Sequence, residues 1–164
     1  MNPKKEQLLQ ETVKKVFEAT MDVNFPLDTL GEFVDSKVMG FGSTREERIL
    51  GLAELRNLLE TQRSQGKELN LRFEITPVHH QLFAQELAAF FTHDFVINTS
   101  GQDKENILPL RISTVFEYHE DGWKLVHWHT SEGADSEGDT WHRNELIRKN
   151  EALNKLVEEK TSEL

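Results

Sequence analysis

The spacing of hydrophobic residues changes near residue 70, and this change limits the fold more than any other feature of the sequence. Before it, apolar residues recur at helical spacing over residues 3–20, in a short segment from Pro26, and around Leu55. After it, residues 71–75 alternate between apolar and polar, as expected of a strand with one buried face. Three helices followed by a meandering antiparallel sheet predict an α+β fold rather than a βαβ arrangement.

The boundaries of the later elements follow from local signals. An extended piece is expected at residues 38–42, and the third helix is expected to begin at the capping-box sequence Thr44-Arg45-Glu46-Glu47. Glycine supplies the positive φ of a tight hairpin turn at Asp121-Gly122. The longer strands are expected at residues 87–98, 108–118 and 122–131.

Composition excludes several classes of function. The chain of 164 residues fits one domain with an appendage, and it has no cysteine for a disulfide or a thiolate site. No stretch approaches the ~20 apolar residues that cross a bilayer, and the N-terminus lacks an apolar signal core. The net charge of −10 argues against binding to nucleic acid or anionic membranes. We expect a cytoplasmic protein that binds neither nucleic acid nor membranes.

The hairpin at residues 117–131 resembles a known family. Its sequence is Glu-Tyr-His-Glu-Asp-Gly-Trp-Lys-Leu-Val-His-Trp-His-Thr-Ser. It is similar to the closing strands of the cone-shaped proteins that include nuclear transport factor 2 (NTF2), the SnoaL-like proteins and ketosteroid isomerase. The association domain of calcium/calmodulin-dependent protein kinase carries a particularly similar run. The resemblance implies a cone of three N-terminal helices and a curved antiparallel sheet over residues 1–134. That fold supports enzymes, binding proteins and oligomerisation hubs, so the function stays open.

The remaining residues, 135–164, predict an acidic linker and a coiled-coil dimerisation helix. The segment 132–139 is acidic and rich in Gly and Ser, whereas 140–164 contains helix formers and no Gly or Pro. A heptad seam places Asn150, Val157 and Leu164 at position a, and Leu146, Leu153 and Lys160 at position d. A lone Asn at position a favours a parallel dimer in register, so we expect a homodimer. The alternative is a helix packed back on its own domain.

The end of the chain has a second resemblance. Val157, Lys160, Thr161 and Leu164 match the linker helix that leads into histidine-kinase or nucleotide-cyclase output domains. The resemblance implies that the chain is a piece of a longer bacterial signalling protein, with an output domain downstream.

The interior of the cone is the candidate ligand site. Val126, Trp128 and Thr130 share one face of a strand, and Thr114 and Phe116 share a face of the strand before it. If these faces point inward, as the kinase resemblance implies, they line an aromatic, neutral pocket. The residues expected to bind a ligand are Trp128, Thr130, Thr114, Phe116, Val126 and Asp94. Trp123 is expected on the opposite face unless a bulge intervenes.

The kinase resemblance also indicates the charge of the ligand. Two arginines of that domain's pocket correspond here to Thr130 and Thr114, so a mostly neutral ligand is expected. A cone filled by its own side chains is the alternative. We interpret the chain as a sensory or dimerisation input domain.

The sequence leaves three other interpretations open. His127 and His129 point to one side of a strand, but no spacing selects further ligands, so no metal or cofactor is expected. A small isomerase or dehydratase would need a base such as Asp94 and a donor such as Tyr118. No catalytic residue is assigned, and an enzyme is the less favoured interpretation. The third alternative is an oligomerisation hub without ligand.

Overall fold

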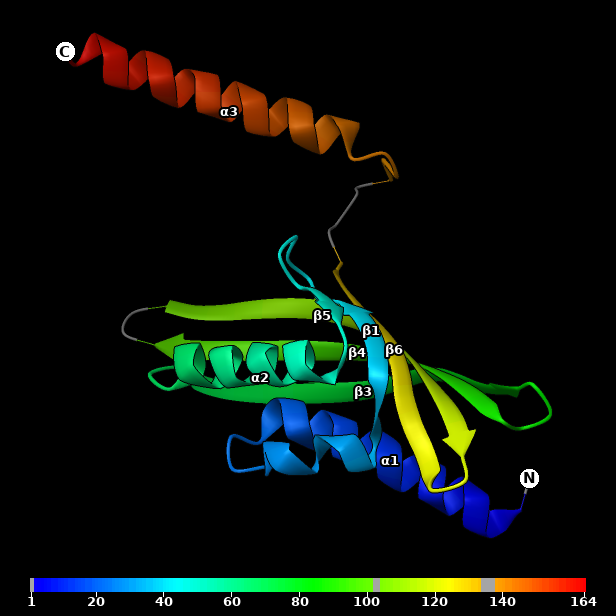
Figure 1. Ribbon diagram of the computed structural model, residues 1–164. Helices are drawn as coiled ribbons and strands as arrows, with labels where there is room; N and C mark the ends of the chain where they lie inside the picture. Colours follow the sequence, from blue (N-terminus) through cyan, green and yellow to red (C-terminus); the bar gives the residue numbers. More distant parts are fainter. Residues whose placement is uncertain (1, 102–103, 134–137) are drawn as a thin grey trace. The chain divides into compact units, whose positions relative to one another are not determined.

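The computed structural model describes residues 2–101, 104–133 and 138–164, and the chain divides into two compact units, Met1–Gly133 and Ala134–Leu164 (Figure 1). The first unit contains, in chain order, α1 (Pro3–Met21), the 3₁₀ helix η1 (Leu27–Glu32), β1 (Val34–Phe41), β2 (Arg48–Leu50), α2 (Leu52–Gly66), β3 (Asn70–Phe83), β4 (Ala88–Gly101), β5 (Lys104–His119) and β6 (Gly122–Glu132). The second unit contains α3 (Arg143–Ser162).

The strands of the first unit form one curved sheet in the order β2-β1-β6-β5-β4-β3 (Figure 1). All neighbours are antiparallel except β1 and β6, which run parallel. The three long strands β3, β4 and β5 are consecutive in the chain and meander, as the alternation after residue 70 indicates. The predicted α+β fold with a curved sheet is confirmed.

Local chemistry explains where α1 begins. The side chain of Asn2 accepts a hydrogen bond from the Lys4 backbone N–H at 2.9 Å, and Pro3 occupies the first turn, where it sacrifices no helical hydrogen bond. Leu9, Val13 and Phe17 then lie one turn apart and are all buried, so α1 packs one stripe against the sheet.

The predicted start of the third helix is wrong. The residues Thr44–Glu47 lie in the turn between β1 and β2, and α2 begins only at Leu52, after Gly51 with φ 94°. The physical reason is the burial of Ile49, which is 8% exposed and pairs with Gly40 of β1. Pairing and burial of this short strand outweigh the local capping signal.

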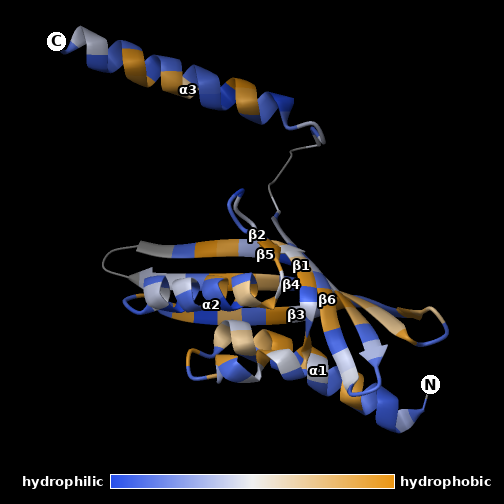
Figure 2. Cartoon of the chain, viewed as in Figure 1, coloured by the Kyte–Doolittle hydropathy of each residue, from blue (hydrophilic) through white to orange (hydrophobic). Residues whose placement is uncertain are grey.

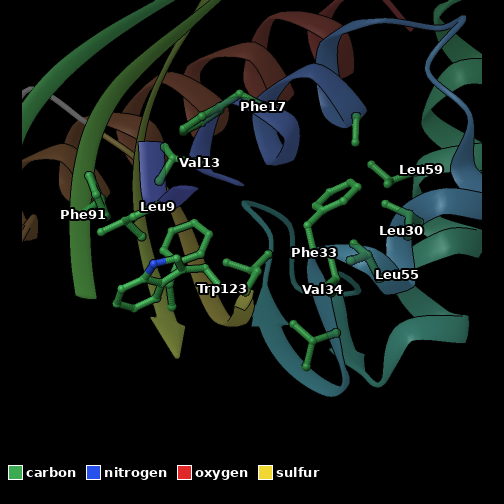
Figure 3. Close-up of a cluster of buried hydrophobic side chains, with 14 of the residues drawn as sticks. Leu9, Val13, Phe17, Leu30, Phe33, Val34, Leu55, Leu59, Phe91 and Trp123 are labelled. Atoms are coloured by element: carbon green, nitrogen blue, oxygen red, sulfur yellow. The ribbon is translucent and has the colours of Figure 1, made fainter. Parts of the chain in front are cut away.

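The core lies between one face of the sheet and the helices α1, η1 and α2 (Figure 3). One part of it contains Leu9, Val13 and Phe17 of α1 with Phe91 and Trp123 of the sheet, and another contains Leu30, Phe33, Val34, Leu55 and Leu59. Burying each of these side chains stabilises the fold by ~1.5–3 kcal/mol before entropy is counted. The face of the sheet that meets the helices is called the inner face below.

A bulge in β6 decides which aromatic residues reach the inner face. Val115 pairs with His127 and Phe116 pairs with Leu125, so Val126 is an extra residue in β6. As a result, Trp123 joins Trp128 on the inner face. Trp123 is only 2% exposed, so its expected place on the opposite face is wrong.

The helix α3 carries its apolar residues exposed. None of its residues, all of which the structure describes, is buried, and Figure 2 shows hydrophobic bands between hydrophilic ones along it. Leu146, Leu153 and Val157 of the predicted seam are 63%, 57% and 56% exposed. The coiled coil stays a prediction. Within the described part of the chain, no helix is long and apolar enough to cross a membrane.

Candidate functional site

A cavity of about 460 Å³ lies between the inner face of the sheet and the helices. The alternation along β3, β4 and β5 turns every second side chain toward it, and these residues are almost all apolar. Its wall on the sheet side includes Phe73, Phe95, Ile97, Leu108, Leu110 and Trp128. The cavity lies within the size range of small-molecule sites.

Three of the six predicted ligand residues line this cavity together. Thr114 pairs with Trp128 across β5 and β6, and Thr130 pairs with Ile112 one step further along the same two strands. The register of these strands therefore places the three side chains side by side on the inner face.

The other three predicted residues do not line the cavity. Phe116 is fully buried and packs edge-on against Phe91, with 5.7 Å between ring centroids. Val126 is the bulged residue of β6. Asp94 is exposed on the outer face of the sheet, where it lines a separate groove of about 310 Å³ with its cross-strand neighbour Arg111.

Thr114 is an unusual wall residue. Its side chain is 1% exposed, and its Oγ1 finds no hydrogen-bond partner among the described residues. Its neighbours across the strands are the aromatic residues Phe91 and Trp128. A buried hydroxyl without a partner costs stability, so the Thr114 side chain is expected to destabilise the fold.

Gly40 fixes the position of Trp128 and was missed by the sequence analysis. The two residues pair across β1 and β6, and a Cβ built on Gly40 would lie 2.2 Å from the indole ring. Only glycine lets the ring lie against the β1 backbone at this point. A glycine inside a strand is itself the signal of such a close approach.

Polar residues of the β1–β2 loop and of α2 also line the cavity. They are Ser43, Thr44, Glu47, Gln62, Arg63 and Gln65. Periodicity did not find these residues because most of them are exposed.

Arg63 joins α2 to the end of α1. Its Nη1 donates to the Phe25 carbonyl at 2.9 Å, and its Nη2 donates to the carbonyls of Ala19 and Asp22 at 3.1 and 2.9 Å. Of these acceptors, Ala19 lies in the last turn of α1, where carbonyls lack an intrahelical partner. The guanidinium is therefore held by the protein itself.

The histidines do not assemble a metal site. His127 and His129 lie on the outer face, opposite Val115 and Ser113, and His127 Nδ1 is 2.9 Å from the Met39 carbonyl oxygen. In the described ranges, no group of three His, Asp or Glu residues could hold a metal ion.

His93 is buried between aromatic rings. Its ring centroid lies 4.7 Å from that of Phe17 and 6.1 Å from that of Phe91. Burial away from water lowers the pKa of His93, because the charged imidazolium is desolvated there. The ring is therefore neutral near pH 7.

The acid and donor of the isomerase hypothesis are not brought together. Asp94 lies on the outer face, whereas Tyr118 packs against Trp123 at the β5–β6 turn, with 5.2 Å between ring centroids. Lys5 lies over the Tyr118 ring at 4.4 Å. Neither residue lines the inner cavity, so it lacks that base and that donor.

A family comparison agrees with the fold. The family model described as a SnoaL-like domain matches residues 10–135. The chain belongs to this SnoaL-like family. The resemblance read from the hairpin sequence is thereby confirmed. No curated protein matches the chain significantly.

Solved structures place this SnoaL-like domain among NTF2-like folds. The CaMKII hub of S. rosetta is 19% identical, with a TM-score of 0.62 over 77% of this chain and 95% of the hub chain. A putative dehydratase of the NTF2-like family from Streptomyces avermitilis is 18% identical, with a TM-score of 0.62 over 79% and 96%. An NTF2-like superfamily protein from Salmonella enterica is 15% identical, with a TM-score of 0.64 over 85% and 99%. At these identities the likeness concerns the fold alone.

Proposed function

We propose that this SnoaL-like domain is the sensory and dimerisation input domain of a cytoplasmic bacterial signalling protein, and that it binds a small, mostly neutral ligand inside the cone. The cavity of about 460 Å³ is the observation that carries the proposal. Among the described residues that line it, only Glu47 and Arg63 are ionisable. An apolar cavity with few polar groups suits binding better than acid–base chemistry.

The second part of the proposal concerns α3. Its exposed apolar seam would pair with the same seam of a second copy, with Asn150 facing Asn150. Two parallel helices would deliver two output domains side by side. A seam that contains Asn150 and Lys160 is weak enough to have two accessible arrangements, which suits an element that transmits a signal.

The enzyme alternative finds less support. A dehydratase or isomerase would need a base inside the cavity, and Asp94 faces away from it. The similarity to a CaMKII hub favours oligomerisation, and a hub without ligand is the remaining competitor. Ligand binding distinguishes the two.

The binding test uses prodan, a small neutral dye that brightens in apolar surroundings. We expect saturable binding to the wild type with one dye per chain. Ile97→Trp should fill the cavity and abolish binding, whereas Val96→Trp on the outer face of the same strand should retain it. A wild type that binds no dye, or an Ile97→Trp variant that binds normally, would contradict the ligand hypothesis.

The association test uses light scattering of the full chain at micromolar concentration, where we expect twice the chain mass. Asn150→Leu should raise the stability of the dimer and loosen its control of register, because an Asn pair is replaced by apolar packing. Cross-linking of cysteines introduced at matched seam positions would report the register. A monomer at that concentration would contradict the proposal.

A further inference from the structure

We infer that the ligand is an uncharged molecule with an apolar body and a hydrogen-bond acceptor at its buried end, and that this acceptor bonds to the hydroxyl of Thr114. The acceptor group has no donor of its own, as in a ketone, an ester or an ether. This inference rests on the proposed function, and it adds the chemical class of the ligand and its direction in the cavity. The observation behind it is a buried hydroxyl without a partner at the inner end of the cavity.

Thr114 lies where the cavity ends along β5. Every second residue of this strand faces inward, and four such residues in succession line the cavity: Leu108, Leu110, Ile112 and Thr114. The next inward residue, Phe116, is fully buried in the core and does not line the cavity. A ligand atom that reaches Thr114 therefore lies against the closed core of the domain.

The surroundings of Thr114 offer no acceptor for its hydroxyl hydrogen. Its cross-strand neighbours are Phe91 and Trp128, and neither a phenyl ring nor an indole N–H accepts a conventional hydrogen bond. The side chain is 1% exposed, whereas Thr99 and Thr130, which also line the cavity, are only half-buried. Valine has the same shape and would fill this position without an unpaired hydroxyl. A threonine here therefore suits binding better than stability.

The count of hydrogens favours an acceptor over a hydroxyl as the group that meets Thr114. A hydroxyl has one hydrogen to donate. A ligand carbonyl or ether oxygen accepts this hydrogen and brings no further donor into the apolar surroundings. A ligand hydroxyl would bring a second hydrogen, and a single bond between two hydroxyls leaves one of the two hydrogens unpaired.

Arg63 is the rival partner for such an acceptor. It lines the same cavity, and its Nε is buried without a partner among the described residues. Both of its Nη atoms donate to backbone carbonyls, which turns the guanidinium toward the end of α1. Substitutions at Thr114 distinguish the two donors, because they leave Arg63 unchanged.

The test measures how tightly three probes with the same two fused rings compete with prodan for the full chain. α-Tetralone has an acceptor without a donor, α-tetralol has a hydroxyl, and tetralin has neither. Tetralone should bind the wild type at least about threefold more tightly than tetralol, because tetralol leaves one hydrogen unpaired. Thr114→Val should weaken tetralone by about threefold to tenfold relative to tetralin, which is the effect of losing one hydrogen bond.

Two further variants separate the hydroxyl from the shape of the side chain. Thr114→Ser keeps the hydroxyl and should hold the ratio of tetralone to tetralin affinity within about twofold of the wild-type value. Thr12→Val is the matched control. It removes a buried hydroxyl that donates to the Leu8 carbonyl and lies outside the cavity lining, so it should leave the ratio unchanged.

The outcomes separate this inference from the proposed function. If prodan does not bind the wild type, the proposed function fails and takes this inference with it. If prodan binds and Thr114→Val leaves the ratio unchanged, the inference is overturned while the proposed function stands, and Arg63 Nε becomes the partner to examine. Tetralol that binds as tightly as tetralone, a ratio that Thr114→Ser does not preserve, or probes that do not displace prodan would overturn the inference in the same way.

Discussion

Thr114→Val tests whether the cavity wall contains a costly unpaired hydroxyl. The substitution replaces Oγ1 by a methyl group of similar shape, next to Phe91 and Trp128. A buried polar group without a partner costs about 1–3 kcal/mol, so removing it should raise the free energy of unfolding by about 1–2 kcal/mol. The higher strand preference of valine acts in the same direction.

The matched control is Thr12→Val on α1. Thr12 is also buried, at 8% exposure, but its Oγ1 donates to the Leu8 carbonyl at 2.8 Å. Removing this satisfied hydroxyl should lower the free energy of unfolding by about 0.5–1.5 kcal/mol. The two variants are therefore expected to change stability in opposite directions.

Urea unfolding followed by tryptophan fluorescence measures both variants, provided that the slope of the free energy against urea concentration stays unchanged. The melting temperature of Thr114→Val should rise by about 2–6 °C. A Thr114→Val variant that is as destabilised as Thr12→Val would show that the hydroxyl of Thr114 has a partner in solution. The Thr114 hydroxyl would then be hydrogen-bonded in the folded protein, which contradicts the reasoning above.

Three further predictions follow from single contacts. Gly40→Ala should lower the free energy of unfolding by about 1–3 kcal/mol and weaken prodan binding, because its Cβ would meet the Trp128 ring at 2.2 Å; an unchanged urea midpoint would refute this. Burial lowers the pKa of His93 in the folded protein below its ordinary value of 6.5. As the pH falls below about 6.5, His93 is therefore protonated in the unfolded chain before it is protonated in the folded protein, and the free energy of unfolding should decrease. His93→Phe should reduce that dependence in urea titrations at several pH values, and an identical pH profile would exclude His93 as its source. Leu153→Glu should abolish cross-linking between α3 helices while the first unit keeps its urea midpoint; retained cross-linking would exclude the seam as the contact.

Hydrophobic spacing by itself determined much of the fold. The stripe of Leu9, Val13 and Phe17 predicted α1, and the alternation after residue 70 predicted the meandering strands. Asp121-Gly122 marked the β5–β6 turn, where Gly122 has φ 121°. These signals are local, because a helix or strand repeats its buried face every few residues whatever it packs against.

Local signals also misled in one place and were incomplete in another. The capping box at Thr44 had the correct chemistry, but pairing of Ile49 with β1 decided the structure there. The sequence around Asp94 does indicate on which face of the sheet this residue lies. His93 and Phe95 are buried on the inner face, and strict alternation places the residue between them on the outer face.

Only the tertiary structure decided the geometry of the site. The bulge at Val126 depends on how β6 pairs with both β5 and β1, and it brings Trp123 and Trp128 onto the same face. The cavity is lined by segments as far apart in the chain as the β1–β2 loop, α2 and the long strands, and no local sequence pattern indicates that they surround one space. A sequence reports which face of each element avoids water, whereas a cavity depends on the register and packing of elements far apart in the chain. Register and packing are fixed only when all elements of the core have packed together.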